Sequence, residues 1–215
     1  MLRAVGKGAS TQPAQRNEIH GFVRDSDLVA RAYEIAREAH SGQRRKDDGS
    51  PFITHPLAVA RVLNNAGFGE DVLAAALLHD VVEDTDLSPD EIERRFGPAV
   101  ARLVEALSED KDIDGYEERK SAHREQVERA GRDAVAIYIA DKLSNLRDMR
   151  AIYRLEGEGI APRFNAPLDV RIDLWEGDAE MAQRVAPELP FLPDFRTELA
   201  EFGRQRAEER AAASR

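Results

Sequence analysis

Residues 70–84 read EDVLAAALLHDVVED, and this stretch decides the fold. From Val72 to Leu78 every residue is apolar, which is typical of a helix buried in the middle of a bundle. Four ionisable residues, His79, Asp80, Glu83 and Asp84, stand in the same segment. Charged groups on a buried helix are costly unless something compensates them. We therefore predict a central buried helix over 70–84 that carries a functional cluster.

The sequence on both sides of this segment is also helical in pattern. Apolar residues recur at three- and four-residue steps from Asp27 to Ala39. A second helix opens at His55-Pro56, with Pro56 at its first position. The tetrapeptide Ser88-Pro89-Asp90-Glu91 is a capping box, which predicts a helix from 89. Further helices are predicted over 98–107 and 117–130, from 133, and over 168–186 and 194–211. No strand-type alternation of useful length appears, so the fold class is all-α.

Composition limits the function further. The chain has 215 residues, with 41 acidic against 31 Lys and Arg, so its net charge is −10. A field of that sign repels a phosphate backbone and argues against a general nucleic-acid binder. Without cysteine there is no thiolate metal site, and no apolar run is long enough to span a membrane. No secretory signal is visible, so we expect a cytoplasmic enzyme or binding module.

The chain divides into three predicted segments. Residues 1–24 are expected to form a flexible N-terminal segment, because they lack apolar periodicity. Residues 25–155 form the helical core. Residues 156–215 form a helical C-terminal extension that packs on the core or continues it.

The four ionisable residues of the central helix suggest a metal site. Their three- and four-residue spacings place Glu83 near both His79 and Asp80, and Asp84 near Asp80. Neighbouring carboxylates repel each other and raise their pKa values. A divalent cation would compensate them, because His nitrogen and carboxylate oxygen are natural ligands. In the alternative interpretation, Glu83 and Asp84 face solvent and His79 is a core histidine. The four together, beside apolar neighbours, favour the cation.

Two other residues are candidates for the same site. His55 lies at a predicted helix N-terminus, from which a side chain can project into a cleft. Asp141 interrupts an apolar helix face formed by Ile137, Ile139 and Leu143. A lone Asp in a helix is more often exposed or part of a salt bridge, so neither residue identifies a site by itself.

Three segments together resemble a known family. They are HSGQRRKDDGSPFITHP (40–56), AALLHDVVEDT (75–85) and ADKLSNLRD (140–148). They look like the hydrolase half of the Rel/Spo alarmone enzymes, and the length is similar to that of the small alarmone hydrolases, within the HD phosphohydrolase superfamily. The resemblance covers about residues 28–150. It implies an HD-domain helical bundle that hydrolyses a small nucleotide.

The resemblance also implies a metal set and a catalytic pair. The implied ligands are His55, His79, Asp80 and Asp141, usually holding one Mn²⁺, although this ligand set does not exclude Fe, Co or Zn. The implied catalytic pair, Glu83 and Asp84, positions and deprotonates the attacking water. The implied reaction removes the 3′-pyrophosphate of (p)ppGpp and gives GDP or GTP plus pyrophosphate.

Substrate-binding residues follow from the same resemblance. Arg45 and Lys46 match an Arg-Lys pair in which the arginine packs against guanine, as a guanidinium plane can. Lys142, Asn145 and Arg147 resemble the family's ribose- and phosphate-contacting group.

Several features depart from the family or leave alternatives open. The loop after Arg45 is one residue longer than in several relatives, Phe52 stands where tyrosine is common, and Tyr138 where lysine is common. The substrate could instead be ppApp or NADPH, since the motifs engage phosphate and metal more than the base. A non-catalytic module that senses a nucleotide or neutralises a partner protein is the remaining alternative, and protein partners are unknown. The residues after 150 are too few for a synthetase domain, so we expect degradation without synthesis.

Overall fold

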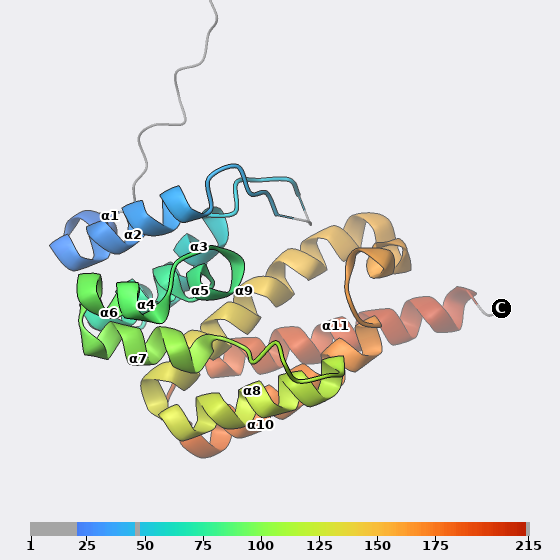
Figure 1. Cartoon of the computed structure of the whole chain (residues 1–215). Helices are drawn as coiled ribbons and strands as arrows, with labels where there is room; N and C mark the ends of the chain where they lie inside the picture. Colours follow the sequence, from blue (N-terminus) through green and yellow to red (C-terminus); the bar gives the residue numbers. More distant parts are fainter. Residues whose placement is uncertain (1–20, 46–47, 214–215) are drawn as a thin grey trace, which may run out of the picture.

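The computed structural model describes residues 21–45 and 48–213, and this part of the chain is helical (Figure 1). It contains no strand, only an isolated bridge between Arg44 and Pro51. The all-α prediction is therefore confirmed. The helices are α1 (Gly21–Arg24), α2 (Asp27–Ala39), α3 (Thr54–Asn65), α4 (Glu70–Leu78), α5 (Val81–Asp84), α6 (Pro89–Phe96), α7 (Pro98–Leu107), α8 (Tyr116–Ala130), α9 (Arg132–Glu156), the 3₁₀ helix η1 (Gly157–Arg163), α10 (Leu168–Val185) and α11 (Leu192–Ala213).

Helix α4 lies at the centre of the N-terminal half. It packs against α2, α3, α7 and α9, and every side chain from Val72 to Leu78 is buried. Neighbours on several sides explain why the helix is apolar all round. The predicted burial of this segment is confirmed.

Local sequence signals set most helix boundaries. Ser88 Oγ accepts from the Glu91 backbone N–H, and the Glu91 carboxylate accepts from the Ser88 N–H, so the predicted capping box is present. Gly97, with φ of 84°, separates α6 from α7. The prediction for Pro56 was wrong in position, because α3 begins at Thr54. Pro56 still lies in the first turn, where a missing N–H leaves no helical hydrogen bond unmade.

The long helix α9 connects the two halves of the molecule. It crosses the molecule diagonally and packs against α3 on one side and α8, α10 and α11 on the other (Figure 1). Trp175 of α10 and Phe195 and Phe202 of α11 belong to the same hydrophobic cluster as the core. The division at residues 155 and 156 remains a prediction.

The N-terminal prediction concerns mostly residues outside the described ranges. Residues 1–20 of the predicted flexible segment are among them, whereas residues 21–24 form α1 and bury Val23. Within the described ranges, no helix is both long and apolar enough to cross a bilayer.

A cluster of ion pairs around the buried Arg206 links the C-terminal helices. Arg206 of α11 is 2% exposed. Its guanidinium donates to Glu158 of η1 at 2.8 Å and to Asp169 of α10 at 2.7 Å. Since both carboxylates also contact Arg210, the cluster links three consecutive elements.

Candidate functional site

The predicted continuous helix over 70–84 is interrupted at His79 and Asp80. Helix α4 ends at Leu78, and the short α5 begins at Val81. Asp80 has φ of −94° and ψ of −8°, in the sparsely populated region where many active-site residues lie. Consecutive side chains on a regular helix do not face each other. The break lets them do so, and His79 Nε2 lies 3.1 Å from Asp80 Oδ2.

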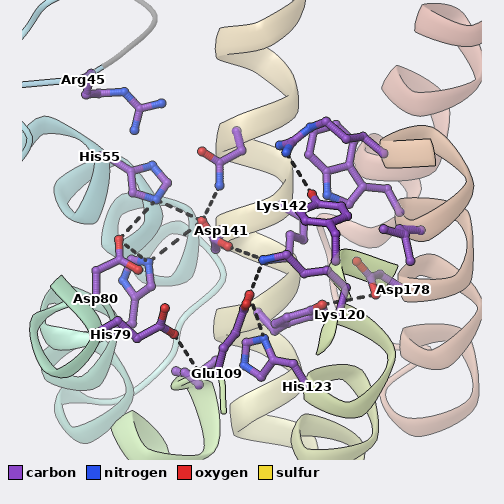
Figure 2. A pocket seen from close by; sticks show the side chains of 18 of the residues that line it. Arg45, His55, His79, Asp80, Glu109, Lys120, His123, Asp141, Lys142 and Asp178 are labelled. Carbon is purple, nitrogen blue, oxygen red and sulfur yellow. Dashed lines mark hydrogen bonds and ion pairs between the residues drawn. The ribbon is translucent and has the colours of Figure 1, made fainter. Parts of the chain in front are cut away.

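Two other helices bring His55 and Asp141 to the same point (Figure 2). His55 is the second residue of α3, and Asp141 lies midway along α9. His55 Nε2 lies 2.9 Å from Asp141 Oδ1 and 4.0 Å from Asp80 Oδ2. His79 Nε2 lies 3.9 Å from the same Asp141 oxygen. The structure therefore brings together all four residues predicted as ligands.

The donor set fits a divalent cation. His55, His79 and Asp141 each offer one ligand atom, and these atoms all lie within 4.8 Å of one another. His79 Nδ1 lies 2.8 Å from the Ala76 carbonyl, which can only accept, so Nδ1 carries a proton. His79 Nε2 is then the nitrogen that faces Asp80, and it is buried and available to a cation, as expected for a metal-ligating nitrogen.

The electrostatics of the cluster also favour a bound cation. Burial lowers the pKa of His79, but the carboxylates of Asp80 and Asp141 outweigh it and raise that pKa to about 9. The carboxylates therefore favour a positive charge at this point, which a divalent cation would supply. This supports a divalent metal site.

A cavity of about 240 Å³ opens beside the cluster. Glu83 lines it, and Glu83 Oε1 accepts from the Glu109 backbone N–H at 2.7 Å. Burial raises the pKa of Glu83, although the Glu109 N–H opposes this. Asp84 lies outside this cavity and lines a second one of about 560 Å³. The two predicted catalytic carboxylates therefore line different cavities, which share Arg45, Phe52, Asn145 and Arg171 in their walls.

The predicted substrate-binding residues occupy different places. Arg45 lines both cavities and pairs with Asp148 at 2.7 Å. Lys46 lies outside the described residues. Lys142 Nζ and Asn145 Nδ2 bind the two oxygens of Asp141, at 2.8 and 2.6 Å.

Arg147 does not join this group. Its guanidinium donates to Glu198 of α11 at 2.7 Å, and it lines neither of the two cavities. Six residues after Asp141, at 3.6 residues per turn, correspond to a different face of α9. A role for Arg147 in substrate binding remains a prediction.

Both departures from the family motif have structural partners. The Phe52 ring lies between His40 and His55, with centroid distances of 4.4 and 6.2 Å. The Tyr138 hydroxyl donates to Asp178 of α10 at 3.2 Å. The Lys142 ammonium lies 4.2 Å from the centre of the Tyr138 ring, where a cation–π interaction is favourable.

Sequence reasoning missed the opposite wall of the cavity, which comes from α8, α10 and the turn before α8. Glu109 pairs with Lys120 and faces His123, both on α8. The charges around α8 hid this pattern, because they are not confined to one face. The residues from α10 were detectable, since 171, 175 and 178 recur at helical spacing on one face. The missed residues are Glu109, Tyr116, Lys120, His123, Arg171, Trp175 and Asp178.

Arg171 sits where the two cavities meet. Its guanidinium lies 5.0 Å from the centres of the Phe164 and Trp175 rings, and its Nη1 donates to the Tyr116 hydroxyl at 3.1 Å. It lines both cavities, so the C-terminal helices contribute directly to the site.

The chain belongs to the HD domain family, whose model matches residues 32–162. Among its relatives is the guanosine-3′,5′-bis(diphosphate) 3′-pyrophosphohydrolase MESH1 of Xenopus tropicalis, 44% identical over 129 residues that cover 59% of this chain and 72% of that protein. The Homo sapiens protein of the same name is 47% identical over 121 residues, covering 55% of this chain and 67% of that protein. The predicted family resemblance is confirmed.

A solved structure agrees with these sequence comparisons. It belongs to a metazoan ortholog of SpoT that hydrolyses ppGpp. The TM-score is 0.62 at 32% identity, and the match covers 84% of this chain and 96% of that one. The match therefore extends beyond the residues of the family model.

Proposed function

We propose that this protein is a hydrolase that removes the 3′-pyrophosphate of (p)ppGpp, giving GDP or GTP and pyrophosphate. The observation that carries the proposal is the His55–His79–Asp141 cluster beside Glu83 in one cavity. The relatives named for this reaction support the choice of substrate.

The proposed ligands are His55, His79, Asp80 and Asp141. A divalent cation held there would supply positive charge for the developing charge on a phosphoryl group and acidify a nearby water. We propose Mn²⁺ as the physiological ion, with Fe, Co and Zn as alternatives that metal analysis of the purified protein would distinguish.

Glu83 is the proposed general base. Its Oε1 is held by the Glu109 N–H, which leaves Oε2 to take a proton from the attacking water. Water adds to the phosphorus attached to the ribose 3′-oxygen, and the bond between this phosphorus and oxygen breaks. Asp84, which lines the adjoining second cavity, completes the pair by orienting the substrate. Raised by burial, the pKa of Glu83 lies nearer to neutrality, which suits a base.

The outer parts of the site bind the nucleotide in this proposal. Arg45 lies where its guanidinium can pack on the base, and Lys46 follows it in the sequence. Lys142, Asn145 and Arg147 are proposed for the ribose and phosphates. We place the reaction in the cytoplasm and require no nucleic acid, membrane or protein partner for it.

The test is release of pyrophosphate from ppGpp by the purified, metal-loaded protein. Asp80→Ala should abolish release, whereas Asp86→Ala, an exposed neighbour outside both cavities, serves as the matched control. Intact ppGpp after incubation with metal-loaded protein would refute the proposal. Parallel incubations with ppApp and NADPH test the two alternative substrates. Nucleotide binding without metal or turnover would instead support a non-catalytic module.

A further inference from the structure

The carbonyl group of Asp84 is held by a side chain from outside its own helix. Gln43, in the loop after α2, donates from Nε2 to the Asp84 carbonyl oxygen at 3.1 Å. At its other end, Gln43 Oε1 lies 2.8 Å from Nδ1 of His40. Gln43 therefore bridges the end of α2 and the end of α5.

The chemistry of the two ends fixes the direction of both hydrogen bonds. A carbonyl oxygen only accepts, so the amide NH₂ of Gln43 must face Asp84 and Oε1 must face His40. His40 Nδ1 must then carry the proton and donate it to Gln43. His40 is 3% exposed, and its Nε2 is buried without a partner. Among the described residues, the buried imidazole thus has one hydrogen-bond partner, Gln43.

Helix α5 needs such a contact because it has only four residues. Its backbone is held by the bonds from Asp84 N to Asp80 O and from Thr85 N to Val81 O. Two of its carbonyl groups accept hydrogen bonds from side chains outside the helix. Lys111 Nζ donates to the Glu83 carbonyl at 2.5 Å. The carbonyl groups of both acidic residues are therefore held by side chains from two different loops.

We propose that Gln43 and His40 are positioning residues that fix the end of α5 and so the orientation of Asp84. The inference rests on the proposed function, in which Asp84, from the adjoining cavity, completes the catalytic pair with Glu83. Substrate contact is not required of either residue. Their effect reaches the reaction through the Asp84 backbone.

Three variants test the pair of hydrogen bonds that runs from His40 through Gln43 to the Asp84 carbonyl, here called the relay. Gln43→Met keeps the length of the side chain but removes both hydrogen bonds. His40→Leu removes the donor. His40→Asn restores it, because the asparagine Nδ2 can occupy the place of imidazole Nδ1. Ser41→Ala is the matched control, since this exposed neighbour touches neither Asp84 nor Gln43.

Pyrophosphate release from ppGpp is measured with saturating metal. Gln43→Met loses the hydrogen bond to the Asp84 carbonyl, and His40→Leu loses the bond that orients Gln43. For each variant we expect roughly a five- to tenfold fall in kcat, with KM and metal affinity unchanged. His40→Asn and Ser41→Ala should retain the wild-type kcat. The double variant Gln43→Met/His40→Leu should lose no more than either single variant, because both break one relay. Additive losses, a change confined to KM, or failure of His40→Asn to restore kcat would overturn the inference.

A second measurement separates this inference from the proposed function. Hydrogen exchange at the Asp84 and Thr85 amides should quicken severalfold in Gln43→Met, while the amides of α4 remain protected. This holds whether or not ppGpp is the substrate. A wild-type protein that leaves ppGpp intact refutes the proposed function alone. Unchanged exchange at the two amides refutes the relay.

Discussion

The buried pair of Asp178 on α10 and Arg124 on α8 tests what holds the opposite wall of the cavity in place. Asp178 Oδ1 accepts from Arg124 Nε at 2.6 Å and from the Tyr138 hydroxyl at 3.2 Å, and its side chain is 3% exposed. Asp178→Ala leaves both donors without this acceptor. We expect the free energy of unfolding to fall substantially, because an unpaired buried charge is costly.

The size of the loss follows from the contacts that remain. Breaking a buried pair costs about 3–5 kcal/mol, and an unsatisfied hydroxyl about 1 kcal/mol more. Arg124 keeps the Leu174 carbonyl at 3.0 Å, and its side chain is 19% exposed, so the low end applies. The total is about 4 kcal/mol, or roughly 8–16 °C in Tm for a chain of this size.

Urea unfolding followed by circular dichroism measures this loss. The double variant Asp178→Leu/Arg124→Met is the control, because apolar side chains of similar volume can replace a buried pair at little cost. We expect it to be more stable than Asp178→Ala. A loss below about 1 kcal/mol in Asp178→Ala, smaller than one typical buried pair, would refute the reasoning.

Three further predictions concern metal, pH and a helix cap. Chelation of the metal should lower the Tm, because a metal at 100 times its Kd stabilises the folded state by about 2.7 kcal/mol. An unchanged melting curve after chelation would contradict the metal site. Burial opposes ionisation of Glu109, but His123 and Lys120 outweigh it and hold the pKa of Glu109 well below its usual 4.5. The ionised carboxylate therefore stabilises the fold above pH 4.5, and this contribution is lost as pH falls further. Glu109→Gln should flatten the acid limb of stability against pH in urea titrations, and an unchanged limb would contradict the assignment. Ser88→Ala should cost about 1 kcal/mol through loss of the capping box, which thermal unfolding measures against an exposed control, Ser121→Ala.

The fold was largely predictable because buried helices and helix caps have recognisable residue patterns in the sequence. The all-round apolar character of residues 72–78 marked α4, and the Ser88–Glu91 box marked the start of α6. The break at His79 and Asp80 was not predictable in this way. His79 keeps right-handed helical dihedrals, Asp80 departs from them at φ of −94° and ψ of −8°, and the apolar pattern continues across both residues, so nothing in the spacing distinguishes one helix from two.

Residues of the site were predictable only where they belong to a family motif. His55, His79, Asp80 and Asp141 come from three separate regions, and the family resemblance joined them before their distances were known. Geometry then added what the motif lacked. Asp178, far along the chain, reaches Tyr138 through the packing of α10 on α9. Arg147 follows Asp141 closely in sequence but faces α11, since adjacency in sequence is not adjacency on a helix.

The two walls of the cavity have different origins along the chain. All four proposed metal ligands lie within the residues matched by the HD domain model, as does the part of the opposite wall that α8 and the turn before it supply, whereas Arg171, Trp175 and Asp178 of α10 lie beyond residue 162. The proposed metal ligands and the α10 part of the wall therefore lie on separate segments of the chain. Mutations in α10 can reshape what the cavity admits without altering the ligand set. A library confined to the cavity-facing positions of that one helix is thus an economical starting point for changing substrate preference.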